Sequence, residues 1–335
     1  MTEVVTLSSP SRRRLLAVSA ALGLVVLSGA GILLLRWAAP AARFVEYRMP
    51  GPRDGPMAIA AAADGTVWFT IDQADAIGRI RGGRIELLPT PGRNYEPLGL
   101  AVAADGSAWY TDIKAGAVVR ISPSGEVAQF ALDSAIVRLG RVAIGPDGSV
   151  WFADATGAGI TQLKDGTFTR HEIGSAGGGP YGVAVTADGI VWATLQAVSK
   201  LIRIEPSGAV AAIDLSRPGV VPTDVAVGTD GSVWFLQFRA NRIGRLKNGE
   251  FSDFKVPDQN AGLSGLVVAA DGAVWFGMVR SSSLGRLRDG RVATFRLPRD
   301  NARPYSLAVD PDGNVWYADI SGYVGMLPAR YAHGS

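Results

Sequence analysis

Four aspartates stand shortly after a tryptophan in different parts of the chain. Asp112, Asp154 and Asp319 each follow a Trp by three residues, and Asp72 follows Trp68 by four. Carboxylate oxygens are the ligands that Mg²⁺ and Ca²⁺ prefer, so a fold that gathers these side chains offers a cation site or acceptors for ligand hydroxyl groups. The alternative is a set of separate, solvated loop charges, and the spacing is compatible with both.

The commonest catalytic side chains are scarce. The chain of 335 residues contains no Cys and two His, which excludes disulfides, thiolate metal sites and cysteine nucleophiles. His171 falls in a predicted outer strand and His333 lies close to the last residue, so neither is expected to act as a general base. The sequence also lacks a Gly-x-Ser-x-Gly motif, a P-loop, a dinucleotide-binding fingerprint and a zinc motif.

The elements that position the aspartates are copies of one motif. Seven of the eight Trp are spaced 41 or 42 residues apart, and an Asp-Gly pair stands four residues before each of them. Asp-Gly favours a tight hairpin because Gly accepts a positive φ, and short β-branched runs flank it. Four short antiparallel strands in every repeat are typical of a β-propeller. The predicted fold is therefore all-β, a seven-bladed β-propeller of four-stranded blades with the repeated Trp side chains packed between blades.

The predicted ring closes through an N-terminal strand. The seventh repeat supplies only three strands, whereas residues 43–49 alternate like the outer strands of the other repeats. We expect this segment to pair with the last blade, because an open ring would leave two unpaired sheet edges. The propeller is thus assigned to residues 42–328 and a short tail to residues 329–335.

The blades differ from one another in the residue eleven positions before each Trp. Tyr181 and Tyr305 at these positions combine an aromatic ring with a polar hydroxyl group, and Arg303 next to them offers a guanidinium fork for a carboxylate or phosphate. Function is expected where the repeats differ, in the loops on one face of the ring. The full set of variable positions is Met57, Leu98, Gly140, Tyr181, Thr223, Ser264 and Tyr305. The candidate ligand-binding residues are Tyr181, Arg303, Tyr305, Asp72, Asp112, Asp154 and Asp319.

Residues 1–41 are predicted to be a targeting segment. Arg12, Arg13 and Arg14 precede an apolar run without charges over residues 15–35, a pattern that resembles a twin-arginine signal. The run is long enough to span a bilayer as a helix. A cleaved signal peptide, a retained hydrophobic anchor helix and a buried core helix all stay open. The first two place the propeller outside the cytoplasm, in the periplasm or the extracellular space, with the anchor tethering it to the cytoplasmic membrane.

The excess positive charge also lies in that segment. Of 33 basic and 30 acidic side chains, 4 and 1 fall within residues 1–41, which leaves 29 of each in the remainder. A neutral body gives no electrostatic reason to bind nucleic acid. The expected partner is a small-molecule or peptide ligand, with the membrane as a second partner through residues 15–35 if they are not cleaved. The protein is expected to be a monomer.

Several motifs resemble those of the virginiamycin B lyase (streptogramin lyase) family. They are Gly179-Pro180-Tyr181-Gly182-Val183, the repeated Asp-Gly-x-Val-Trp-Phe, Asn241-Arg242-Ile243-Gly244-Arg245-Leu246 and Asn301-Ala302-Arg303-Pro304-Tyr305. The resemblance covers all seven repeats. It implies a propeller that opens a cyclic depsipeptide antibiotic at its ester by elimination, with Mg²⁺, and that uses His and Glu residues of the last two blades. At those positions this chain has Ser264, Arg303, Tyr305 and Ile320.

Two classes of function therefore stay open. Elimination needs a base for the α-proton and an acid or cation for the leaving carboxylate, and neither Ser nor neutral Tyr is a base near pH 7. One hypothesis is an exported propeller that binds a small molecule, a peptide or a cell-envelope ligand on its axial face. The other is a metal-dependent lyase, or a lactone- or ester-opening enzyme, whose rewired site uses Asp319 or another of the aspartates. The two tyrosines either contact a ligand or only plug the mouth of the channel.

Overall fold

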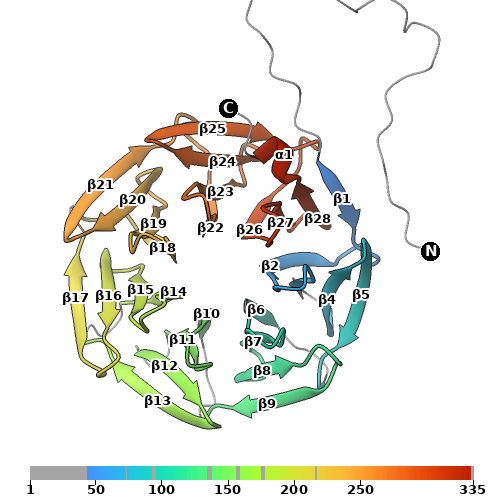
Figure 1. Ribbon diagram of the computed structural model, residues 1–335, viewed down its shortest axis with the longest axis horizontal. Coiled ribbons are helices and arrows are strands. Elements are labelled where there is room, and N and C mark those ends of the chain that lie inside the picture. Colours follow the sequence, from blue (N-terminus) through green and yellow to red (C-terminus); the bar gives the residue numbers. More distant parts are fainter. Residues whose placement is uncertain are drawn as a thin grey trace, which may run out of the picture.

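The computed structural model describes residues 44–72, 74–92, 96–133, 138–155, 159–174, 178–215 and 217–332. These residues form seven four-stranded antiparallel sheets, arranged as blades around a central axis (Figure 1). Within a blade, successive strands run from the axis to the rim. The seven-bladed all-β propeller predicted from the Trp period is confirmed, whereas the N-terminal targeting segment lies outside the described residues.

The strands fall into four classes by their distance from the axis. The innermost strands are β2 (Gly55–Ala61), β6 (Pro97–Val102), β10 (Leu139–Ile144), β14 (Pro180–Val185), β18 (Pro222–Val227), β22 (Leu263–Val268) and β26 (Pro304–Val309). The second strands, which carry the repeated Trp, are β3 (Val67–Asp72), β7 (Ala108–Asp112), β11 (Val150–Asp154), β15 (Val191–Leu195), β19 (Val233–Gln237), β23 (Val274–Met278) and β27 (Val315–Asp319). The third strands are β4 (Ala76–Arg81), β8 (Ala117–Ile121), β12 (Gly159–Lys164), β16 (Lys200–Ile204), β20 (Arg242–Lys247), β24 (Ser283–Arg288) and β28 (Tyr323–Leu327). The rim strands are β5 (Arg84–Pro89), β9 (Val127–Ala131), β13 (Thr167–Glu172), β17 (Val210–Asp214), β21 (Glu250–Lys255), β25 (Arg291–Arg296) and β1 (Val45–Arg48).

The ring closes as predicted, because β1 pairs antiparallel with β28 over all four of its residues. Figure 1 shows β1 beside β28, where the first and last parts of the described chain meet. Tyr47 stacks on Trp316 with ring centroids 5.9 Å apart, and Phe44 packs edge-on against Tyr317 at 6.0 Å. Aromatic packing therefore holds the closing strand in addition to its ladder of hydrogen bonds.

Each Asp-Gly-x-x-Trp unit forms a turn, and in the third and fifth blades a Ser of the unit also binds the Trp indole. In the third blade, Gly148 has a φ of 78°, which a residue with a Cβ rarely adopts. The Asp147 carboxylate accepts the N–H of Ser149 at 3.1 Å. The Ser149 hydroxyl in turn accepts Nε1–H of Trp151 at 2.8 Å. In these two blades the unit thus encodes both the reversal of the chain and the orientation of the indole.

The repeated Trp side chains lie in the apolar clusters between blades, as predicted. Six of the seven are buried, and Trp109 is half-buried. In five blades an Arg of the third strand lies over the indole ring, as Arg245 does at 5.1 Å from the Trp234 centroid. Truncating a buried Trp of this kind to Ala costs about 3–5 kcal/mol, so these positions are read as scaffold.

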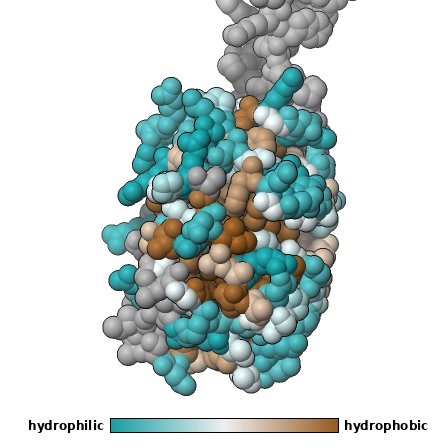
Figure 2. Space-filling view, turned by 90° about the vertical axis from the view of Figure 1, so that its left-hand side faces the viewer, coloured by the Kyte–Doolittle hydropathy of each residue, from teal (hydrophilic) through white to brown (hydrophobic). Residues whose placement is uncertain are grey.

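The space beside the Trp of the fourth blade is less well filled. In five other blades an aromatic or imidazole ring of the rim strand lies against the Trp, but Ile213 takes this place beside Trp192. A cavity of about 810 Å³ lies between the fourth and fifth blades, lined by these two side chains and Phe251 among others. Figure 2 shows hydrophobic surface in the middle of the side that bears β17 and β21, framed by hydrophilic residues. This cavity lies between two blades and away from the axis, and exposed turn residues such as Asp188 and Asn248 line part of it.

The residues after the ring form a short helix, α1 (Ala329–Ala332). Ala332 is buried, and the Arg286 guanidinium donates to its carbonyl oxygen. The N–H of Ala329 donates to Asn314 Oδ1 at 2.9 Å. The described part of the tail is therefore attached to the last two blades, and His333 lies outside the described residues. Within the described part of the chain, no helix is long and apolar enough to cross a membrane.

Candidate functional site

An ion pair that spans the central channel dominates the axial end of the inner strands. Arg141 Nη2, from the third blade, lies 3.7 Å from Asp224 Oδ2 of the fifth, and their side chains are only 12% and 13% exposed. Arg141 Nη1 also donates to Ser306 Oγ of the seventh blade at 3.4 Å. Burial alone would lower the pKa of Arg141, but the Asp224 carboxylate and the two neighbouring tyrosines together outweigh it and hold that pKa above its ordinary value. The channel therefore contains a permanent positive charge.

Tyr181 and Tyr305 both lie against this guanidinium. The Arg141 Cζ atom is 5.9 Å from the Tyr181 ring centroid and 5.8 Å from that of Tyr305. The two hydroxyl oxygens are 3.3 Å apart. Burial raises the pKa of Tyr181 far above its ordinary value, with the nearby Arg141 charge opposing the rise only in part, so its hydroxyl is protonated near pH 7. The variable positions of the fourth and seventh blades thus meet over the axis.

A cavity of about 260 Å³ lies beside this cluster. Its lining residues are Arg141, Tyr181, Gln196, Thr223, Asp224, Phe238, Leu263, Ser264, Gly265 and Tyr305. Four of them stand eleven residues before a repeated Trp, and Gln196 and Phe238 follow a repeated Trp by four. A neighbouring hollow of about 480 Å³ shares Gln196 with it and contains Arg239. The positions at which the repeats differ therefore line a concave site at one end of the channel.

Ser264, which stands where the family resemblance implies a catalytic His, has a structural contact. Its hydroxyl donates to the carbonyl oxygen of Pro304 in the next blade at 2.5 Å. Similar bonds join other blades at this level, such as the Thr194 hydroxyl to the carbonyl of Thr223 at 3.2 Å. Ile320, at another of the family positions, donates its N–H to a loop carbonyl and does not line the cavity.

Asp112 is fully buried and serves its own blade. Its Oδ2 accepts the N–H of Glu96 at 3.1 Å, and its Oδ1 accepts the N–H of Ala115 at 2.8 Å. Burial raises the pKa of this carboxyl. Asp72 and Asp154 are half-buried and do not line the axial cavity. Across the described ranges, no group of three or more His, Asp and Glu side chains is placed to hold a metal ion, so the structure does not gather Asp72, Asp112, Asp154 and Asp319 into a cation site there.

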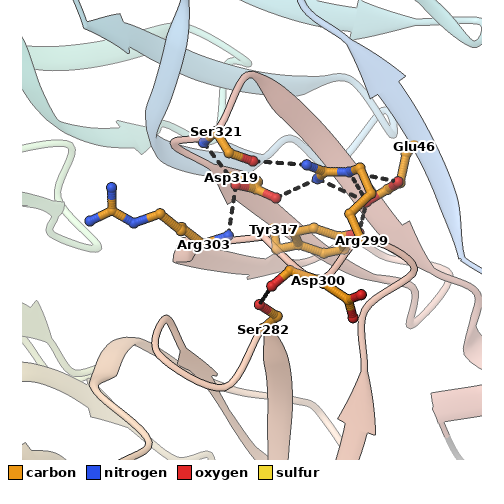
Figure 3. A network of polar contacts seen from close by, with 8 residues as sticks. All are labelled: Glu46, Ser282, Arg299, Asp300, Arg303, Tyr317, Asp319 and Ser321. Atoms are coloured by element: carbon orange, nitrogen blue, oxygen red, sulfur yellow. Dashed lines mark hydrogen bonds and ion pairs between the residues drawn. The ribbon is translucent and has the colours of Figure 1, made fainter.

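Asp319 belongs to a polar network that anchors the closing strand (Figure 3). It is fully buried. Its Oδ1 accepts the N–H groups of Arg303 and Ser321 at 2.9 and 2.8 Å, and its Oδ2 is paired with the Arg299 guanidinium. Arg299 Nη2 also lies 3.1 Å from Glu46 Oε1 of β1. This carboxylate therefore joins a loop, a hairpin and the closing strand.

Replacing Asp319 with Ala should lower the free energy of unfolding by about 2–3 kcal/mol. Two backbone N–H groups lose their acceptor, and the half-buried Arg299 keeps only Glu46 as a counter-ion. Urea unfolding at pH 7 measures the loss. Asp300→Ala is the matched control, because that carboxylate is 95% exposed in its pair with Arg296 and should cost less than about 0.5 kcal/mol. Equal effects of the two substitutions would show that the network does not stabilise the ring.

Arg303 takes part in that network only through its backbone N–H. Arg303 is exposed, and Figure 3 shows its guanidinium directed away from Asp319 and Arg299. His171 lies on the rim strand β13 with its ring 5.0 Å from that of Trp151, where burial lowers its pKa. Of the sequence-predicted ligand residues, the structure therefore brings Tyr181 and Tyr305 together at the cavity.

Two residues of the site, Arg141 and Asp224, were missed by the sequence analysis. They stand ten residues before a repeated Trp, one position after the variable set. The seven residues at this offset are Ala58, Gly99, Arg141, Gly182, Asp224, Gly265 and Ser306. Two opposite charges among five small residues were a readable signal, since a charged side chain at a crowded inner strand needs a partner.

The residues around the cavity do not fit the Mg²⁺ that the family resemblance implies. Asp224 supplies the carboxylate of the lining. Its Oδ1 accepts the N–H of Val225 and its Oδ2 accepts the N–H of Leu266, both at 3.1 Å. The same group faces the Arg141 guanidinium, so a cation would meet a like charge and carboxylate oxygens already in use.

Comparison with known proteins agrees with this architecture. The sequence matches the model of the virginiamycin B lyase family over residues 37–197 and 139–330. A virginiamycin B lyase from Nocardia farcinica (strain IFM 10152) is 32% identical over 218 residues, which are 64% of this chain and 74% of that protein.

Solved structures of such lyases share the fold. A streptogramin B lyase structure is similar with a TM-score of 0.81 and 26% identity, covering 85% of this chain and 96% of that one. A catalytically inactive variant of virginiamycin B lyase from Staphylococcus aureus with quinupristin gives a TM-score of 0.81 and 25% identity, covering 85% and 99%. The chain described here belongs to the virginiamycin B lyase family.

Proposed function

We propose that this family member is an exported propeller that binds a small molecule, a peptide or a cell-envelope ligand at the axial cavity, without the lyase reaction. The observation that carries the proposal is the composition of that cavity. It combines aromatic rings with an Arg141–Asp224 pair, and Ser264 and Tyr305 stand where the family resemblance implies His residues. A hydroxyl that donates to a backbone carbonyl and a tyrosine are poor acceptors for an α-proton near pH 7.

The same cavity has the features of a binding site. Apolar and aromatic walls with a few convergent polar groups are typical of ligand pockets. Tyr181 and Tyr305 supply rings with polar ends, Gln196 supplies an amide, and Phe238 is 40% exposed at the rim of the cavity. An exposed Phe next to a concave polar site is well placed to cover an apolar part of a ligand.

Substitutions on the axial face test the location. A ligand is first identified by a thermal-shift screen of small acids, peptides and cyclic depsipeptides on the purified full chain. Tyr305→Ala and Arg303→Ala are each expected to raise its Kd about tenfold, since the first removes a ring that lines the cavity and the second removes an exposed positive charge two residues before it in the chain. Arg291→Ala on the exposed part of rim strand β25 is the matched control and should leave Kd unchanged. A control that weakens binding as much as the two axial changes would place the site elsewhere.

We also propose that the propeller is exported, tethered by residues 15–35 if they are retained. The support is the cluster Arg12, Arg13 and Arg14 ahead of the apolar run, together with a body of balanced charge. In intact spheroplasts, added protease should remove an epitope tag placed after Ser335. Arg12→Lys with Arg13→Lys should abolish that removal, because a twin-arginine signal requires both. A tag that is cleaved only after lysis would contradict export.

A further inference from the structure

We propose that the axial site takes a carboxylate, either a small organic acid or the carboxyl end of a peptide, on the guanidinium of Arg141. The inference rests on the binding function proposed above and adds the chemistry of the ligand. It is based on three observations. Arg141 has hydrogen-bond donors without acceptors, the Asp224 oxygens already accept backbone N–H groups, and exposed arginines lie near the opening of the cavity.

Arg141 has more donors than acceptors. Its Nη1 reaches Ser306 Oγ only at 3.4 Å, and its Nη2 lies 3.7 Å from Asp224 Oδ2, which is an ion-pair distance rather than a hydrogen-bond distance. Its Nε is buried and has no hydrogen-bond partner among the described residues. A buried N–H without an acceptor is unfavourable. A planar carboxylate matches a guanidinium with two parallel N–H···O bonds.

Asp224 balances the charge of Arg141 without satisfying its donors. Each of its oxygens accepts a backbone N–H, from Val225 and from Leu266. The carboxylate is therefore held toward the fifth and sixth blades, and Arg141, which lines the cavity, keeps N–H donors that Asp224 does not accept. A second carboxylate, entering through the cavity, would supply the hydrogen-bond acceptors that the Arg141 guanidinium lacks.

The tyrosines add a donor and exclude the opposite class of ligand. One of the two hydroxyls donates to the other across 3.3 Å, so the remaining O–H is available to a ligand oxygen. Two aromatic rings and a carboxylate would suit a cationic ligand, but the Arg141 guanidinium already lies against both rings. A cationic ligand would have to displace it.

The charges around the mouth point to the same ligand class. Arg303 and Arg239 are exposed, and neither guanidinium has a hydrogen bond or an ion pair recorded within the described ranges. Arg303 precedes Tyr305 by two residues, and Arg239 lines the neighbouring hollow. Cations without local counter-ions raise the local concentration of an approaching anion.

The size of the cavity sets the scale of the bound group. Its volume of about 260 Å³ lies just below the roughly 300–1,000 Å³ of pockets that enclose drug-sized ligands. One amino-acid-sized acid fits this volume, with its side chain against Phe238 and its carboxylate on Arg141. A longer ligand would insert its carboxyl end and leave the rest on the face of the ring.

The test uses N-acetylphenylalanine and its amide, which differ in the charge of one group. Titration of the full chain in mild detergent, by calorimetry, should show the acid binding at least tenfold more tightly than the amide. Asp224→Asn should tighten binding of the acid several-fold, because it removes the competing negative charge. The double change Arg141→Met with Asp224→Asn leaves no unpaired buried charge and should abolish the preference for the acid. Arg291→Ala is the control that should change neither affinity.

The outcomes separate this inference from the proposed function. Equal binding of acid and amide, both weakened by Tyr305→Ala, would keep the axial site and refute the carboxylate. If the wild-type protein does not bind the acid but binds a neutral ligand in a Tyr305-dependent way, the axial site is likewise kept and the carboxylate preference is refuted. A preference for the acid that survives the double change would refute the role of Arg141. Acid binding that depends on Arg291 and not on Tyr305 would overturn both proposals.

Discussion

Removing residues 44–48 is expected to cost the propeller at least about 5 kcal/mol of folding stability. The deletion takes away the whole of β1 and exposes the edge of β28. It also removes the rings of Phe44 and Tyr47 from Tyr317 and Trp316. The loss is large because the closing strand combines a β-ladder, aromatic packing and a charged network in one segment.

The charged network makes the deletion worse than the loss of one strand. Glu46 accepts from the Arg299 guanidinium and from the Tyr317 hydroxyl, the latter at 2.9 Å. Burial and the Glu46 charge raise the pKa of Tyr317, so without Glu46 a buried hydroxyl and a half-buried Arg299 both lose an acceptor. Thermal and urea unfolding measure the effect. Deleting residues 38–42, which precede the described ring, is the size-matched control and should leave the midpoint within 1–2 °C of the intact chain. Equal midpoints for the two deletions would disprove closure by β1.

The sequence predicted the fold in detail because the same turn-and-Trp motif, with its flanking strands, occurs seven times at a fixed period. A single Asp-Gly-x-x-Trp unit indicates a turn, whereas seven units at a fixed period require blades of equal size. The missing fourth strand of the last repeat then left residues 43–49 as the candidate partner, and β1 lies within them at Val45–Arg48. Repetition also reveals the positions at which the blades differ from one another. Tyr181 and Tyr305 occupy two of these positions, and their hydroxyl groups meet at the axis.

The rest of the site depends on how far side chains reach across the ring. Arg141 touches residues of the fifth and seventh blades, and no local pattern encodes a contact between blades that are not neighbours. The four aspartates are not grouped to hold a metal ion among the described residues, for a related reason. Asp112 and Asp319 end their strands opposite Pro97 and Pro304, so each carboxylate meets the N–H groups of the adjacent loop. The spacing along the chain predicted that the four aspartates lie at a similar level of the ring. It could not show that backbone N–H groups of the adjacent loops would donate hydrogen bonds to their carboxylates.

The axial chemistry leads to a second large expected effect. Purified protein incubated with quinupristin and Mg²⁺ should open the ester at least about a thousandfold more slowly than a streptogramin lyase run beside it. Loss of one positioned acid or base typically costs 10²–10⁴ in rate, and groups that act together are not additive. Ser264, Arg303, Tyr305 and Ile320 stand at the implied catalytic positions. The Ser264 hydroxyl donates to the carbonyl oxygen of Pro304, and the expectation rests on these side-chain types, since neither a guanidinium nor a neutral phenol is a general base near pH 7.

Detection has to separate isomers, because elimination opens the ring without changing the mass. Liquid chromatography with tandem mass spectrometry resolves the linear product from the cyclic antibiotic. Chelation of Mg²⁺ and the variant Asp224→Asn complete the design, since a rewired metal-dependent enzyme would lose its activity in one or both. Efficient ring opening that depends on Mg²⁺ would favour the rewired lyase and refute the binding-only function. Slow or absent opening, with the antibiotic still bound in a Tyr305-dependent way, would place this propeller among proteins that retain the family scaffold and hold a ligand where its relatives cleave one.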